Sequence, residues 1–241
     1  MERLGQLLFR WRSFTPVPLL AVAALLVWRS RGPASPLWLA AGLLLCLAGQ
    51  LLRAWVLGFV QDGTSGQNEK LIAVALNTEG PYALTRNPLY LGNLGICAGL
   101  CLVAHDPRLL LLVCTLFAVQ YWFIIAAEEG FLRGRFGAAY DEYCSRVPRF
   151  WPRPVHTEST RWNWARIVRK EHNPCAAWLA LVVLLDALDH RAHLWPYAIS
   201  MTAILVLWLC AKGWKHHWLS GNFLKDMRRR LRETPRSPKA R

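Results

Sequence analysis

The sequence predicts an all-α integral membrane protein, a multi-pass bundle of about six transmembrane helices. Hydrophobic residues make up 54% of its 241 residues, 13 of which are Trp, and the mean hydropathy is +0.20. A soluble domain of this length has less apolar surface to bury. The apolar residues also gather in several long runs, each near the about 20 residues that a helix needs to cross about 30 Å of hydrocarbon. Together, composition and run length indicate the fold class.

Six apolar runs are the predicted spans. The first is short, and Pro16 and Pro18 blur its start. A cleaved signal peptide is the alternative there, but Arg29 and Arg31 follow the run where small residues are expected, so we interpret it as a retained helix. The predicted spans are Phe14 to Trp28, Leu37 to Val60, Pro88 to Ala104, Leu109 to Ala127, Pro174 to Leu188 and Trp195 to Lys212.

Basic residues are distributed unequally between the two sets of loops. Six spans place residues 1–13, 61–87, 128–173 and 213–241 on one side, and these segments with Lys212 hold 24 of the 29 Lys and Arg. Positive loops mark the cytoplasmic side, so both termini are expected there. The net charge of +14 then reflects topology and attraction to anionic lipid. Nucleic-acid binding is disfavoured, because the charge is split among membrane-flanking segments.

The cysteines and glycines of the predicted spans favour packing over chemistry. Cys97 and Cys101 share a helix face with Gly92, Gly95 and Gly99, a small-residue pattern typical of close helix contact. No C-x-x-C pair or zinc-like spacing is present, so we predict seven free thiols and no metal site. The seven are Cys46, Cys97, Cys101, Cys114, Cys144, Cys175 and Cys210.

A polar, proline-containing loop leads from Gly80 into the third predicted span. Pro88 suits the first turn of that helix, where its missing N–H costs nothing. The first-turn N–H groups and Arg86 form a positive corner for a carboxylate or phosphate. Asn87 is suited either to cap the helix or to hydrogen-bond a ligand. Aromatic rings with hydroxyl groups flank this corner, and they suit either a ligand or the membrane interface: Tyr82 and Tyr90.

Three elements follow one another along residues 50–152. A Gln-Asn-Glu-Lys stretch occupies Gln67 to Lys70. A pattern G-x-Y-x-x-x-R-N-P-x-Y-x-G comprises Gly80, Tyr82, Arg86, Asn87, Pro88, Tyr90 and Gly92. Paired glutamates, followed by F-G-x-x-Y-x-x-Y-x-x-x-V-P, comprise Glu128, Glu129, Phe136, Gly137, Tyr140, Tyr143, Val147 and Pro148. In this order the elements resemble the isoprenylcysteine carboxyl methyltransferase and phospholipid methyltransferase superfamily, membrane enzymes that use S-adenosylmethionine.

The resemblance implies a cofactor pocket that faces the cytoplasm and a methyl transfer to a lipid-like or prenylated acceptor. Arg86 and Glu128 are implied to act at the reacting cofactor. No metal is implied. The residues that match the cofactor contacts of the family are Gln67, Val74, Ala75, Leu76, Asn77, Tyr82, Arg86, Asn87, Pro88, Leu89, Tyr90 and Glu128.

The two glutamates of the pair are expected to have different roles. Glu129 has Arg133 four residues on, the favoured orientation for an exposed helical ion pair. Glu128 has Ile124 and Leu132 as its i±4 neighbours and aligns with the glutamate that binds cofactor in the family. We therefore predict that Glu128 binds the cofactor and that Glu129 has a structural role.

Two departures from the family pattern bear on the substrate. Asn87 stands where the family usually has histidine, so a proton step that needs a residue titrating near neutral pH is absent. Ile124 stands where carboxyl methyltransferases place an arginine that binds the substrate carboxylate. We therefore expect a different lipid-like acceptor, reached through the bilayer.

Two other functions remain open at this point: a membrane reductase of the sterol-reductase type that uses NADPH, and a non-catalytic protein with a degenerate pocket. No G-x-G-x-x-G loop is present. The predicted organisation is 1–60 for N-terminal helices, 61–173 for the methyltransferase core and 174–241 for a helical hairpin with a basic tail. Arg53 lies within a span and either reaches toward the interface or lines the pocket. Glu171 to Asn173 are interpreted as a helix start.

Overall fold

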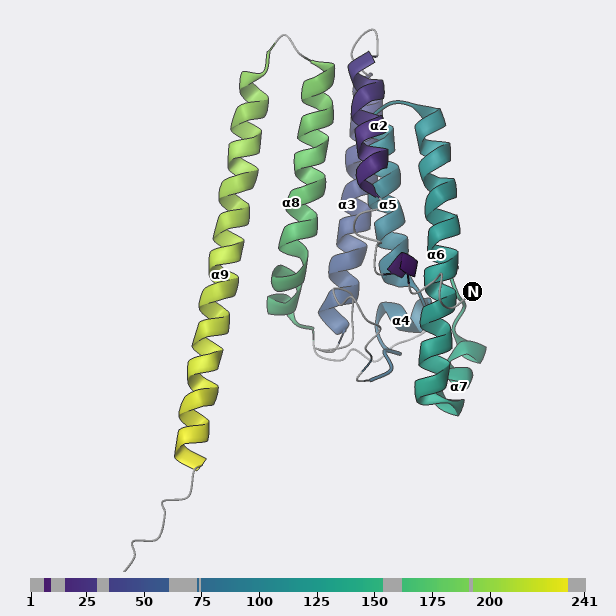
Figure 1. Ribbon diagram of the computed structural model, residues 1–241, viewed down its shortest axis with the longest axis vertical. Helices are drawn as coiled ribbons and strands as arrows, with labels where there is room; N and C mark the ends of the chain where they lie inside the picture. The colour runs from purple at the N-terminus through teal and green to yellow at the C-terminus, as the bar shows by residue number, and fades with distance from the viewer. Residues whose placement is uncertain are drawn as a thin grey trace, which may run out of the picture.

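The protein is all-helical throughout the part that its computed structural model describes. That part comprises residues 7–9, 16–29, 35–60, 73, 75–153, 162–190 and 193–233, with backbone alone at 16, 17 and 216–233. Long helices run roughly parallel to one another, and two short ones gather at one end (Figure 1). The helices are α2 (Pro16–Arg29), α3 (Pro36–Phe59), α4 (Pro81–Leu84), α5 (Pro88–Val103), α6 (Pro107–Phe136), α7 (Ala138–Arg146), α8 (Trp164–Asp189) and α9 (Trp195–Glu233).

Three helices are long and apolar enough to cross a membrane, which makes this an integral membrane protein. They are α3, α6 and the Trp195–Lys215 part of α9, while α2 and α5 contain shorter apolar stretches. Prolines open most of these helices at the first or second position, where a missing N–H is tolerated. The predicted bounds of the second and third spans agree with α3 and α5 to within one residue.

Helix α8 corrects one prediction. It begins at Trp164, ten residues before the predicted start at Pro174, which lies inside the helix. Glu171 to Asn173 therefore do not open a helix. The observed start is fixed by Asn163, whose side chain accepts a hydrogen bond from the Arg166 amide at 3.0 Å, the usual N-cap arrangement.

Helices α3 and α5 are in backbone contact along their lengths, as the small-residue pattern predicted. A Cβ atom at Gly49 would lie 2.6 Å from the carbonyl oxygen of Gly92, and one at Gly99 would lie 2.7 Å from that of Gly42. Side chains larger than hydrogen do not fit at those distances. The buried apolar core extends from this contact to α2, α6 and α8. All seven cysteines are free thiols, as predicted.

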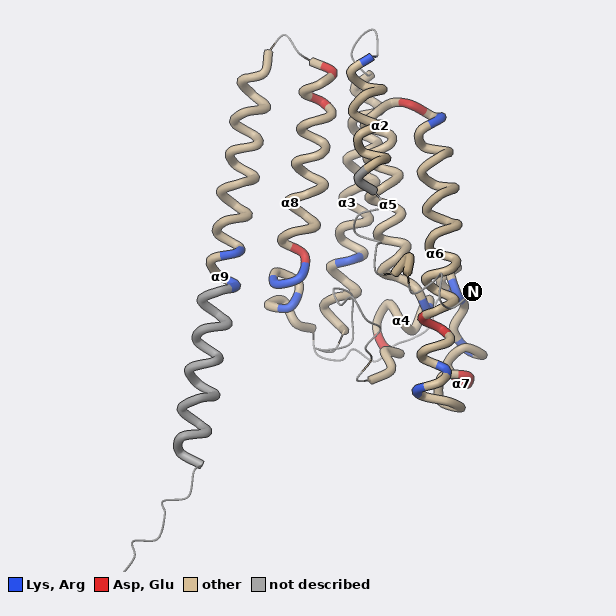
Figure 2. The backbone as a smooth tube through the Cα atoms, viewed as in Figure 1, with Lys and Arg blue, Asp and Glu red and all other residues tan. Residues whose placement is uncertain are grey.

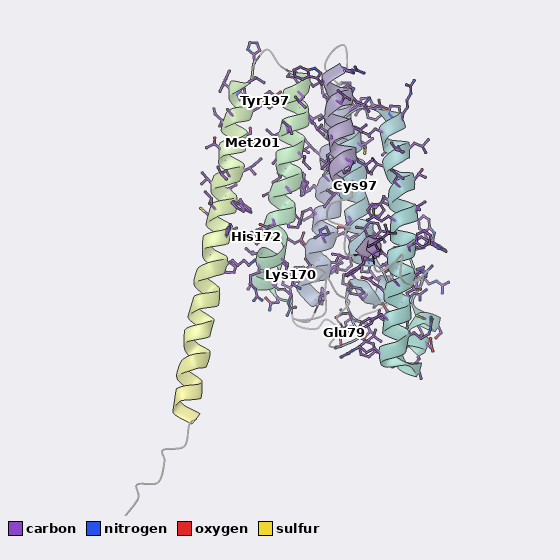
Figure 3. The ribbon with its side chains drawn as sticks, in the orientation of Figure 1. Glu79, Cys97, Lys170, His172, Tyr197 and Met201 are labelled. Carbon is purple, nitrogen blue, oxygen red and sulfur yellow. The ribbon has the colours of Figure 1, made fainter. Side chains whose placement is uncertain are left out.

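Helix α9 packs against α8, away from the helices that carry the sequence motifs (Figure 1). A groove of about 330 Å³ lies between the two helices, lined by alanines of α8 and by Met201, Ile204 and Leu205 of α9. At one end of the groove Trp208 Nε1 donates to Asn173 Oδ1 at 2.8 Å. Figure 3 shows Glu79, Lys170 and His172 toward one end of the bundle and Tyr197 toward the other.

Candidate functional site

The start of α5 meets the last third of α6 through two side chains from the sequence motifs. The Tyr90 hydroxyl donates to Glu128 Oε1 at 2.6 Å, a short, charge-assisted hydrogen bond. The Tyr90 ring also lies against Tyr121, with 4.6 Å between ring centroids. The proline-headed helix and the glutamate pair, separated by some forty residues in sequence, thus form one corner of the molecule.

The second glutamate of the pair holds two arginines. Arg149 donates from Nε to Glu129 Oε1 at 3.0 Å and from Nη2 to Oε2, and Arg86 Nη1 lies 3.3 Å from Oε1. The Glu129 side chain is only 13% exposed, so these pairs are poorly screened by solvent. Arg149 also lies over the Trp122 ring, 5.0 Å from its centroid. Its hydrogen bond to Glu129 raises the pKa of Arg149.

This arrangement corrects the predicted partner of Glu129. Arg133 pairs instead with Asp141, at 2.8 Å between Nε and Oδ1. The chain reverses at Gly137, whose φ of +53° favours glycine, and α7 then brings Asp141 back beside α6. The structural role predicted for Glu129 agrees with its position between two loop arginines, although its partners are distant in sequence.

The loop before α5 is anchored to the segment that follows α7. The Arg86 amide donates to the Pro148 carbonyl at 2.9 Å. Thr85 Oγ1 and Asn87 Nδ2 both donate to the Arg149 carbonyl, at 3.1 and 3.0 Å. Asn87 occupies the N-cap position of α5, but its side chain makes no cap hydrogen bond. Its capping role is therefore wrong, and its amide fixes the loop instead.

Tyr82 lies in the short helix α4 and is held from behind. Its carbonyl accepts a hydrogen bond from the Tyr143 hydroxyl at 2.7 Å. Burial raises the pKa of Tyr82, and the charge of Glu128 raises it further, so the phenol stays protonated at neutral pH. Gly80 at the head of α4 has a φ of +57°, and a Cβ there would lie 2.7 Å from the Phe59 ring.

The remaining predicted contacts are distributed around the same loop. Pro88 is fully buried at the start of α5, and Leu89 beside it is half-buried. Leu76 packs against a cluster of Tyr140, Tyr143 and Val147. Ala75 and Asn77 flank it and are partly buried. Two predicted contacts, Gln67 and Val74, lie outside the described residues.

The chemistry of this corner fits an S-adenosylmethionine molecule. Arg86 Nε is buried and has no hydrogen-bond acceptor among the described residues, and such an N–H is costly to leave unmade. It lies next to the first turn of α5, a 16-residue helix whose N–H groups attract anions. An anion-binding donor and a carboxylate, Glu128, therefore lie on either side of Tyr90, as a ligand with a carboxylate and an ammonium requires.

Sequence reasoning missed several side chains of this region. Arg149 follows immediately after the last motif residue, so its position next to the Val-Pro element was a usable signal. Asn93, one turn beyond Tyr90, and Tyr121, about two turns before Glu128, gave no such signal. Among the described residues, no three His, Cys, Asp or Glu side chains gather in the manner of a metal site.

Residues 37–139 match the family model described as phospholipid methyltransferase. This segment of the chain belongs to that family. The match contains the Tyr90–Glu128 contact and ends before Arg149, and α8 and α9 lie beyond it. The earlier resemblance is thereby confirmed. In a phospholipid methyltransferase segment the polar corner between α5 and α6 is the natural place to seek the reaction.

Two curated relatives are similar to part of the chain. The cobalt-zinc-cadmium resistance protein CzcN of Cupriavidus metallidurans is 32% identical over 119 residues, which is 49% of this chain and 51% of that protein. The nickel-cobalt-cadmium resistance protein NccN of Alcaligenes xylosoxydans xylosoxydans is 28% identical over 120 residues, 49% of this chain and 56% of that protein. The chain spans about half the length of these relatives. No solved structure matches it.

Proposed function

We propose that this protein is an S-adenosylmethionine-dependent methyltransferase that acts on a lipid-like acceptor at the cytoplasmic face of a membrane. The hydrogen bond from Tyr90 to Glu128 carries the proposal, because it joins the two motif elements into one site. Membership of residues 37–139 in the phospholipid methyltransferase family supports the general activity. The cofactor and the acceptor class are argued below from the site itself.

Opposite charges at the two ends of the corner suit a zwitterionic ligand. Arg86 Nε and the first-turn N–H groups of α5 would hold the methionine carboxylate. Glu128 would hold the ammonium group or the ribose hydroxyls, with Tyr90 fixing the carboxylate that does so. Around them, the predicted contacts Gln67, Val74, Ala75, Leu76, Asn77, Tyr82, Asn87, Pro88 and Leu89 would form the walls of the pocket.

The side chains present favour alignment over acid–base chemistry. Bound S-adenosylmethionine supplies an electrophilic methyl group on a sulfonium, whose transfer is accelerated mainly by orientation and exclusion of water. Tyr82 remains a protonated donor because burial raises its pKa, and Asn87 does not titrate. Neither residue therefore acts as a base near neutral pH, and the site positions the reactants instead.

The acceptor is inferred to be neutral or an amine, and not an anionic carboxylate. Ile124 is completely buried, with an exposed fraction of 0%, at the position where the resemblance would place a substrate-binding arginine. Arg86 and Arg149 are both paired with Glu129. No cation among the described residues therefore replaces the missing arginine at that point of α6. An acceptor with an apolar tail would reach the site from the bilayer.

The proposed topology has six spans with both termini in the cytoplasm. It adds α2, α5 and α8 to the three helices that are long enough to cross. Figure 2 shows many of the charged residues at the end of the bundle that carries α4 and α7, which is the end where positive residues would be retained. The site then faces the cytoplasm, where the cofactor is available.

Titration of the purified protein in detergent with S-adenosylmethionine and with NADPH tests the proposal. We expect saturable binding of the methyl donor alone, and weaker binding in Glu128→Gln. Glu142→Gln is the matched control, because Glu142 lies on α7 in an exposed ion pair with Arg146. Saturable binding of NADPH alone, or an unchanged affinity in Glu128→Gln, would overturn it. Incorporation of labelled methyl groups into lipid extracts would then identify the acceptor.

A further inference from the structure

A buried polar cluster joins α8 to α3 at mid-bundle. Glu171 accepts hydrogen bonds from Arg53 Nη2 at 2.6 Å, from Arg53 Nε at 3.0 Å and from Gln50 Nε2 at 2.7 Å. Trp178 Nε1 donates to Gln50 Oε1 at 2.9 Å. Glu171 is only 4% exposed. Neither predicted role of Arg53 describes this arrangement, since the guanidinium is bound side-on to a carboxylate of a neighbouring helix.

The cluster continues from Arg53 toward the proposed site. Arg53 Nη1 donates to Asn93 Oδ1 on α5, and Asn93 Nδ2 lies 3.4 Å from the Tyr121 hydroxyl on α6. The Tyr121 ring is stacked on Phe117, with 4.0 Å between centroids, and it contacts Tyr90. One contiguous set of contacts therefore runs from α8 through α3, α5 and α6 to the Tyr90–Glu128 pair.

We propose that Asn93 and Tyr121 are positioning residues for the methyl transfer, held in place by the Arg53–Glu171 ion pair. They would fix the ring of Tyr90, and through it the carboxylate of Glu128. Helix α8 would thus be part of the catalytic architecture although it lies beyond the family match. The inference rests on the proposed function, because positioning has meaning only if this corner binds the reactants.

Stability alone does not explain the cluster. Replacing a buried ion pair by apolar residues of similar volume is often neutral or stabilising, whereas removing one partner is destabilising. The donors of Arg53 are divided between Glu171 on one side and Asn93 on the other, so the pair also orients a side chain that faces the site. Orientation is what an alignment-dependent reaction needs, since a misplacement of about 1 Å can cost about 10²-fold in rate.

The decisive variant is the double substitution Arg53→Leu with Glu171→Leu. It removes both charges together, so the protein should fold with little change in melting temperature, while Asn93 loses its donor. We expect the turnover number to fall about tenfold or more, with a smaller change in the KM for S-adenosylmethionine. Asn93→Leu and Tyr121→Phe should have the same effect, and combining either with Tyr90→Phe should add little.

Trp178→Phe is the matched control, because it removes a hydrogen bond from the same cluster on the side away from Tyr90. It should lower the melting temperature slightly and leave turnover unchanged. Hydrogen exchange over residues 81–92 gives a second readout, expected to be faster in Asn93→Leu and Tyr121→Phe and unchanged in the control. If these two variants change only the melting temperature, as the control does, the positioning role is wrong.

The same exchange measurement separates this inference from the proposed function. A wild-type protein that binds no S-adenosylmethionine would refute the proposed function and, with it, the catalytic meaning of the positioning residues. Faster exchange in the two variants would still show that the cluster orders the α4–α5 corner. Full turnover in the double variant, in a wild-type enzyme that does transfer methyl groups, would overturn the further inference alone.

Discussion

Neutralising each glutamate of the pair in turn should separate ligand binding from stability. Glu129→Gln removes the charge that holds Arg86 and Arg149, whose side chains are 16% and 25% exposed. Breaking a fully buried pair costs about 3–5 kcal/mol, and partial exposure of both arginines reduces this to about 2–3 kcal/mol. For a chain of this length that corresponds to a fall of about 4–12 °C in melting temperature.

Glu128→Gln should act mainly on the ligand. The amide oxygen of glutamine still accepts the hydrogen bond from Tyr90, so we expect a loss of at most about 1 kcal/mol of stability. A bound ammonium group would lose its ionic partner, worth about 1.5–3 kcal/mol. The Kd for S-adenosylmethionine should therefore rise about 10- to 100-fold.

Calorimetric titration and thermal unfolding of both variants in the same detergent measure the two effects. The expected pattern is a crossed one, with the larger affinity loss in Glu128→Gln and the larger stability loss in Glu129→Gln. An affinity loss confined to Glu129→Gln would refute the assignment of the two carboxylates, and so would equal effects of both variants on both quantities.

Three further outcomes are expected. Arg86→Lys keeps a positive charge but removes the buried Nε, so the affinity for S-adenosylmethionine should fall about tenfold in a binding titration. Gly49→Ala places a Cβ 2.6 Å from a backbone oxygen and should lower the melting temperature, whereas Gly134→Ala, with nothing within 4 Å, should leave it equal or slightly higher. Burial raises the pKa of both Tyr82 and Tyr143, so their neutral forms stabilise the fold fully below the unfolded pKa of about 10 and lose that contribution as the pH rises further. Melting temperatures should therefore decline above about pH 10, and less steeply in Tyr143→Phe than in the wild type.

Local sequence signals predicted the helices whose ends are marked by chain chemistry. Pro36 and Pro88 follow polar residues and begin uninterrupted apolar runs, so α3 and α5 were located to within one residue. Helix α8 was misplaced because Pro174 and the charged residues before it are typical of a helix start. Their actual position depends on Glu171 being neutralised by Arg53, 118 residues away, which no local pattern contains.

The site followed the same division. Tyr90 and Glu128 were predicted to share a pocket because both belong to recognisable motif elements, and they are in contact. The partner of Glu129 was wrong because the rule for i,i+4 pairs considers only one helix. Arg149 arrives from a segment twenty residues later, and its backbone carbonyl also binds Thr85 and Asn87. A single loop residue thus fixes both the glutamate and the loop, which sequence spacing does not show.

The charge of the corner narrows what it accepts. Arg86 and Arg149 share one carboxylate, Glu129, and the further carboxylate of Glu128 is held by a phenol that burial keeps protonated or by the ring beside it. At the positions of Asn87 and Ile124 the chain has neutral side chains where its resemblance would supply a histidine and an arginine. Both departures lower the affinity of this surface for an anionic acceptor, while Glu128 favours cationic groups. We therefore expect a panel of lipids with matched tails to show methyl transfer to neutral or amine head groups and none to carboxylates, and transfer to a carboxylate would contradict this account of the substrate without affecting that of the cofactor.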